Sequence, residues 1–142
     1  MSIFPTKIAL GTDGSRDAEL AATTAVGFAK STGSELNVVT VAEEYPHHEA
    51  YWSLAEHSRQ RAQEVLAEQT RKLENLGGAI GQHHLRTGTA SEEVIRSAEE
   101  MGAGLVVVGS RGRGRIRRAL MGSVADSVVR HAHCPVLVVR PD

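Results

Sequence analysis

Residues 105–112 read Leu-Val-Val-Val-Gly-Ser-Arg-Gly, an apolar run that ends in a turn rich in glycine and hydroxyl side chains. A short run of branched apolar residues bounded by glycine is typical of a strand that is buried on both faces. Further on, Gly122-Ser123 precedes a helical segment that extends to about His131, and Val136-Leu-Val-Val139 is a last apolar strand. This end of the chain therefore predicts a strand, a loop, a helix and a strand.

The residues before this stretch alternate in the same way. Strands are predicted over Lys7–Thr12, Leu36–Val41 and, more weakly and with the composition of an edge strand, Ala79–Arg86. Helices are predicted from Arg16 to about Ser31, over Ala50–Leu76, and from the capping-box spacing Thr89-Ala-Ser-Glu92 to Gly102. Strands that alternate with helices indicate βαβ units, and 142 residues fit a single domain over positions 1–142.

This alternation predicts an α/β fold with an open, mostly parallel five-stranded sheet. Right-handed crossovers place helices on both of its faces. We expect the strand order 3-2-1-4-5, in which the first and fourth strands are neighbours and the winding reverses between them. Ligands of open sheets bind at such a reversal, beyond the carboxyl ends of the strands. The turns after the first and fourth strands are therefore the candidate site.

Composition narrows the class of protein. Hydrophobic residues make up 41% and charged residues 23% of the chain, close to the average of soluble globular domains. The net charge of −1 offers no overall attraction for nucleic acid or an anionic membrane, and no run approaches the roughly 18 apolar residues of a membrane span. The single cysteine, Cys134, excludes an internal disulfide and fits a reducing compartment. We expect a cytoplasmic protein without a membrane or nucleic-acid partner.

The two turns have the composition of a phosphate-binding site. They read Gly11-Thr-Asp-Gly-Ser15 and Gly109-Ser-Arg-Gly112, and the second leads to Gly122-Ser123 at the start of a helix. Phosphate groups bind converging backbone N–H donors that no Cβ obstructs, next to a helix N-terminus. Taken singly, each glycine also fits a tight turn and Ser123 also fits a helix cap. Their combination at the reversal of winding favours phosphate binding.

Other phosphate and catalytic motifs are excluded. Gly109 to Gly114 has the glycine spacing of a Walker A loop, but Arg115 and Ile116 replace its lysine and hydroxyl residue. The dinucleotide pattern Gly-x-Gly-x-x-Gly is absent after the first strand. The paired histidines lack the cysteine or carboxylate spacing of a familiar zinc site, so no metal site and no catalytic residues are predicted.

Five arginines, at positions 111, 113, 115, 117 and 118, lie between the glycine pairs. They fit a basic loop over the phosphates better than a single-stranded nucleic-acid contact, because no aromatic side chains are interspersed for base stacking. A solvated loop without a ligand is the alternative.

Gly109-x-x-Gly112, nine residues, then Gly122-Ser123 resembles the motif of the ATP-binding universal stress proteins. The likeness includes Gly-Thr-Asp-Gly-Ser after the first strand and His-Cys-Pro-Val-Leu-Val-Val near the end, and it covers essentially the whole chain. The resemblance implies a Rossmann-like fold that binds ATP with Mg²⁺. It also implies a homodimer through the strand Val136–Val139, with shielding of that edge by the chain's own helices as the alternative.

The resemblance further implies roles for single residues. Adenine and ribose would contact Thr12, Asp13 and Val41; ribose and phosphates would contact Gly109, Arg111 and Gly112; and Gly122, Ser123 and Val124 would close on the phosphates. Ala125 departs from the pattern, since ATP-binding members often carry a hydroxyl there. Asp13 has two interpretations, because a carboxylate beside phosphate is repelled unless it meets a ribose hydroxyl or magnesium, and it also suits a turn.

The leading hypothesis is an ATP-binding stress-response regulatory protein, a nucleotide-dependent switch with at most slow ATP hydrolysis. Two alternatives stay open: a dimeric interaction module that has lost ATP binding, and a nucleotide-hydrolysing enzyme on the same scaffold.

Overall fold

The computed structural model describes residues 2–111 and 121–141. Within them the chain forms, in order, β1 (Lys7–Gly11), α1 (Arg16–Thr32), β2 (Glu35–Ala42), a short 3₁₀ helix η1 (Glu49–Tyr51), α2 (Trp52–Asn75), β3 (Ile80–Thr87), α3 (Ala90–Met101), β4 (Leu105–Gly109), α4 (Ser123–His131) and β5 (Val136–Val139). Every helix and strand expected from the sequence is present, with ends that differ by one or two residues.

The strands form one parallel sheet in the order β3-β2-β1-β4-β5. This confirms the predicted Rossmann-like arrangement and its strand order 3-2-1-4-5. In β1, Leu10 pairs with Val38 of β2 on one side and with Val107 of β4 on the other. The winding reverses between β1 and β4, so the turns that follow these two strands lie side by side at one edge of the sheet.

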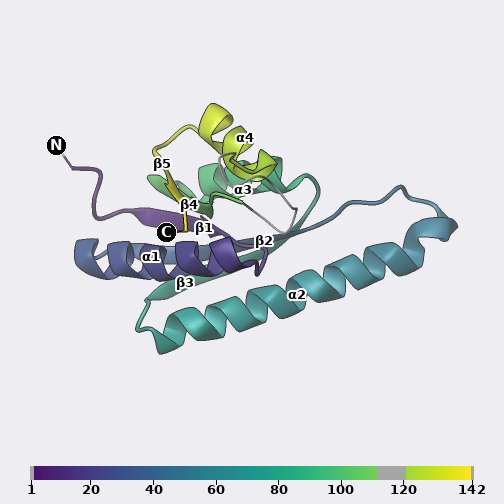
Figure 1. Ribbon diagram of the computed structural model, residues 1–142, viewed down its shortest axis with the longest axis horizontal. Coiled ribbons are helices and arrows are strands. Elements are labelled where there is room, and N and C mark those ends of the chain that lie inside the picture. Colours follow the sequence, from purple (N-terminus) through teal and green to yellow (C-terminus); the bar gives the residue numbers. More distant parts are fainter. Residues whose placement is uncertain (1, 112–120, 142) are drawn as a thin grey trace.

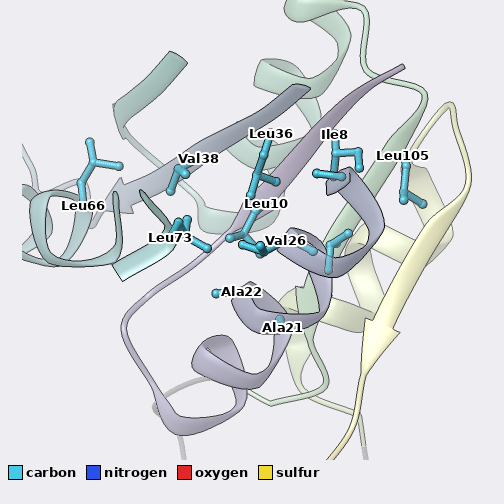
Figure 2. Packing of buried hydrophobic residues seen from close by; sticks show 13 residues of the cluster. Ile8, Leu10, Ala21, Ala22, Val26, Leu36, Val38, Leu66, Leu73 and Leu105 are labelled. Atoms are coloured by element: carbon cyan, nitrogen blue, oxygen red, sulfur yellow. The ribbon is translucent and has the colours of Figure 1, made fainter. Parts of the chain in front are cut away.

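Helices cover both faces of the sheet. Figure 1 shows α1 and α2 on one face and α3 and α4 on the other. On the first face, Leu10 of β1, Leu36 of β2 and Leu105 of β4 pack against side chains such as Val26 of α1 and Leu73 of α2 (Figure 2). A second cluster packs α3 and α4 against Ala9, Val39, Val106 and Val108. The central strands are mostly apolar because both of their faces are buried, although β2 also buries the polar residues Asn37 and Thr40.

Local signals explain both ends of α1. The Ser15 hydroxyl accepts a hydrogen bond from the amide of Ala18 at 3.3 Å and begins α1, and Gly33, with φ of 69°, ends it. The predicted capping box at Thr89 is wrong, because the side chain of Thr89 makes no capping bond. Glu93 holds this turn instead, since its carboxylate turns inward and pairs with Arg86 at 3.1 Å.

In the described ranges, no helix combines the length and the apolar character that crossing a membrane requires.

Candidate functional site

The turn after β1 is held by its own side chains. The amide of Thr12 donates to the carbonyl of Val39 at 2.9 Å, which continues the contact between β1 and β2 past the end of the strand. The Asp13 carboxylate accepts from the amide of Ser15 at 2.9 Å. This bond gives Asp13 the turn-stiffening role that the sequence suggested as one of its two interpretations.

The turn after β4 is fixed to three neighbouring elements through Ser110. Its amide donates to the carbonyl of Val139 in β5 at 2.8 Å, and its carbonyl accepts from the amide of Gly122 at 2.6 Å. Its hydroxyl donates to the carboxylate of Asp17 in α1 at 3.0 Å. Ser110 therefore positions the end of β4 relative to α1, α4 and β5 at once.

Gly109 and Arg111, on either side of Ser110, both contact the first turn of α1. A Cβ at position 109 would lie 2.8 Å from the carbonyl carbon and the carbonyl oxygen of Asp17, so the packing of α1 against β4 requires glycine there. The guanidinium of Arg111 donates through Nε to Asp17 Oδ2 at 3.1 Å. The side chain of Arg111 is one-quarter exposed, whereas that of Asp17 is 7% exposed.

A cavity of about 90 Å³ lies between these two turns, at the carboxyl ends of β1, β2 and β4. Its walls include six of the nine candidate residues, namely Thr12, Asp13, Val41, Gly109, Arg111 and Val124. The remaining walls are mostly apolar and consist of Gly11, Ala18, Val39, Ala90, Val94, Val108 and Ala125.

Two wider depressions continue from this cavity. A groove of about 890 Å³ shares Ala90 and Val124 with it and extends over Ser123, Ser127 and the segment 43–47. A second depression, of about 370 Å³, shares Asp13, Val41 and Ala90 with the cavity and lies against the first half of α2. Sites for small ligands commonly enclose about 300–1,000 Å³, so the crevice as a whole has the room that the inner cavity lacks.

The start of α4 differs in one respect from the expected phosphate contact. Gly122 is buried and precedes the first turn, but its amide already donates to Ser110. The next three amides, of Ser123, Val124 and Ala125, are among the first N–H groups of the helix, which have no acceptor within it. These three amides, rather than that of Gly122, are the donors that α4 offers to a ligand.

Three helices begin at the cavity. Ala18 lies in the first turn of α1, Ala90 is the first residue of α3 and Val124 is the second residue of α4, and all three line the cavity wall. Each helix N-terminus carries a partial positive charge of about half an elementary charge. Arg111 is paired with Asp17 and the Asp13 carboxylate lies in the same wall, so the helix N-termini, rather than a net positive side-chain charge, are what this crevice offers to an anion.

Sequence reasoning missed the apolar part of the wall. Ala90 and Val94 reach the cavity from α3, which no ligand-binding motif marked. The available signal was the position of Ala90, three residues after the carboxyl end of β3 at Thr87. Gly112 and the arginines at 113, 115, 117 and 118 lie outside the described residues. Ala125, where a hydroxyl was expected, is 2% exposed and packs in the second core cluster.

The single cysteine and one of the paired histidines, His133, do not line this cavity. Burial raises the pKa of the half-buried Cys134 thiol, which suits a packing residue better than a nucleophile. His133 Nε2 lies 2.7 Å from Glu99 Oε1 at the protein surface. Over residues 2–111 and 121–141, no three histidine, cysteine or acidic side chains gather as they would around a metal ion.

Comparison with known proteins gives one consistent result. The sequence model of the Universal stress protein family matches residues 5–140. A universal stress protein of Methanocaldococcus jannaschii is 35% identical over 139 residues, which cover 94% of this chain and 81% of that protein.

Solved structures agree with the sequence match. The universal stress protein UspA from Lactobacillus plantarum superposes with a TM-score of 0.85 at 23% identity, over 98% of this chain and all of that one (100%). A universal stress protein in complex with cAMP superposes with a TM-score of 0.76 at 25% identity, over 97% and 98% of the two chains.

Proposed function

The chain belongs to the universal stress protein family, and from this premise we propose that it is an ATP-binding regulatory protein of the stress response. Its crevice would hold the nucleotide at the carboxyl edge of the sheet, and a protein partner would respond to whether the site is filled. Hydrolysis would be slow at most. Its place of action would be the cytoplasm.

The observation that carries this proposal is the convergence of the three helix N-termini and Arg111 on one cavity. Backbone amides at a helix start bind anionic oxygens well, because the N–H groups lack acceptors and the helix dipole adds positive charge. The apolar wall of Val39, Val41 and Val94 suits a ring system rather than a free anion. A nucleotide combines these two chemistries, and the relative solved with cAMP binds one.

The lining of the crevice supports a set of proposed contacts. The amides of Ser123, Val124 and Ala125 and the guanidinium of Arg111 would bind phosphate oxygens, and Asp13 would meet a ribose hydroxyl. Ala125 contributes its amide, so the absence of a hydroxyl there costs one contact rather than the site. Mg²⁺ would be held chiefly by the phosphates and water, as it commonly is in nucleotide sites.

Calorimetric titration with MgATP tests the proposal. We expect saturable binding by the wild type and a loss of at least tenfold in affinity for Val124→Glu, because the new carboxylate would face the phosphates at the start of α4. Val129→Glu is the matched control, since Val129 lies on the same helix, is 47% exposed and does not line the crevice. Absence of saturable binding at millimolar MgATP would overturn the proposal and favour a dimeric interaction module without nucleotide.

We propose in addition that the protein is a homodimer through β5. Among the described residues this strand pairs with β4 alone and ends the sheet, yet its four residues are all apolar and half-buried. An apolar strand edge with unpaired backbone groups tends to pair with another chain. A second copy of β5, related by a two-fold axis, would satisfy those groups.

A further inference from the structure

Asp17 is a buried acid that no part of the motif marks. It is the second residue of α1, and its side chain is 7% exposed. A buried carboxylate is costly unless hydrogen bonds and an opposite charge compensate it. Both compensations come from the turn after β4, because Ser110 Oγ and Arg111 Nε donate to the same carboxylate oxygen at 3.0 and 3.1 Å.

The bond to Nε determines what Arg111 presents to the cavity. A guanidinium is planar and rigid, so fixing Nε against Asp17 restricts the directions of the two terminal nitrogens. In the described part of the chain, the Nε bond is the one hydrogen bond recorded for this guanidinium. Arg111 lines the cavity, whereas Asp17 stands behind it and does not. The terminal fork is therefore the part left for a ligand.

We propose that Asp17 is a positioning residue for the nucleotide, which acts by holding the Arg111 guanidinium toward the phosphates before they arrive. The inference rests on the proposed function, because it assumes a phosphorylated ligand in the cavity. An arginine that is ordered in advance loses less conformational freedom when it binds, so the same contact yields a higher affinity.

Ser110 connects Asp17 to the start of α4 as well. Its hydroxyl is bound by Asp17, and its carbonyl accepts from Gly122 directly before the first turn of α4. Asp17 thus supports both phosphate-binding groups, the guanidinium directly and the α4 amides through Ser110. Gly109 makes this possible, because any side chain there would push the backbone of Asp17 away.

The direction in which one substitution changes the ATP affinity distinguishes a positioning role from a simple charge effect. Asp17→Asn removes a negative charge near the proposed phosphates, so electrostatics alone would tighten ATP binding. Loss of the charged hydrogen bond from Arg111 to Asp17 would instead weaken ATP binding by about two- to tenfold, the factor that corresponds to ordering one long side chain on binding. We expect the weakening. Glu19→Gln makes the same change of charge in the same turn of α1, where Glu19 pairs with the exposed Lys72, and should leave affinity unchanged.

A double-mutant cycle shows whether Asp17 acts through Arg111. Calorimetry with MgATP is performed on the wild type, Asp17→Asn, Arg111→Gln and the double variant. We expect the double variant to lose less affinity than the two single losses multiplied together, because without Arg111 only the weaker support of α4 through Ser110 is left to remove. Multiplied losses, or an Asp17→Asn protein that binds as well as or better than the wild type, overturn the inference and leave the proposed function standing. A wild type that binds no ATP overturns both.

A second measurement does not depend on the variants folding. The experiment follows, by NMR of the wild-type protein, how fast the Nε–H proton of Arg111 exchanges with water. We expect a protected resonance in the free protein that stays protected when MgATP is added. Loss of protection on binding would show that Arg111 leaves Asp17 for the ligand, and the positioning role would be wrong.

Discussion

The close contact between β4 and the first turn of α1 makes Gly109→Ala a sharp test of the fold around the site. An added Cβ would lie 2.8 Å from the carbonyl carbon and oxygen of Asp17, about 0.6 Å inside the 3.4 Å at which ordinary contact begins. The obstructing atoms are backbone atoms of a helix, so a rotamer change does not relieve the overlap. We expect the free energy of unfolding to fall by about 1–3 kcal/mol, the usual cost of overpacking a core.

Urea denaturation followed by circular dichroism measures this change in the free energy of unfolding. In a separate thermal melt, the melting temperature should fall by about 4 °C for each kcal/mol in a chain of this size. Gly27→Ala is the matched control. Gly27 lies within α1 and nothing approaches its Cβ position within 4 Å, so the same substitution should raise stability by about 0.5–1 kcal/mol through helix propensity. A Gly109→Ala protein as stable as the wild type would refute the packing argument.

Three further outcomes are expected. Burial raises the pKa of the Cys134 thiol, so iodoacetamide should alkylate the folded protein more slowly than the urea-unfolded chain at about pH 8, and equal rates would contradict this. Burial, and then the charge of Arg86, lowers the pKa of His84 in the folded state. The free energy of unfolding should therefore decline as pH falls through about 6.5, where the imidazole takes up a proton more readily in the unfolded chain. His84→Gln should make this decline smaller in urea titrations performed at several pH values. Val138→Pro should convert the proposed dimer to a monomer in sedimentation experiments. The carbonyls of Pro135 and Val139 accept hydrogen bonds from the β4 side, so the N–H of Val138, which alternates with them along the strand, points outward to the proposed partner. An intact dimer would place the interface elsewhere.

Much of the architecture follows from the sequence because its signals are local. The runs Leu105–Val108 and Val136–Val139 are apolar on every residue, which predicts strands. The first is buried between the two layers of helices, whereas the second is half-buried at the edge of the sheet. Gly33 and Gly102 end helices in the left-handed region, where glycine has no steric penalty. Once the strands and helices are known, right-handed crossovers leave few strand orders to consider.

The details of the site follow less well because they are set by tertiary contacts. Asp17 reads as an ordinary acid in the first turn of a helix, and only the approach of Ser110 and Arg111 shows that it is buried. Gly122 reads as a phosphate contact, but its amide is already bound to Ser110. Thr89 has the spacing of a cap, yet its side chain makes no capping bond, and the carboxylate of Glu93 pairs with Arg86 next to the same turn.

The close packing of α1 against Gly109 affects how relatives of this protein are to be classified. A chain that keeps the helix so close to the sheet needs glycine at this place whether or not it ever meets a nucleotide. Finding that glycine in another sequence thus reports on helix packing and says little about ligands. An arginine at the position of Arg111 together with an acid at that of Asp17 would be more informative about nucleotide binding.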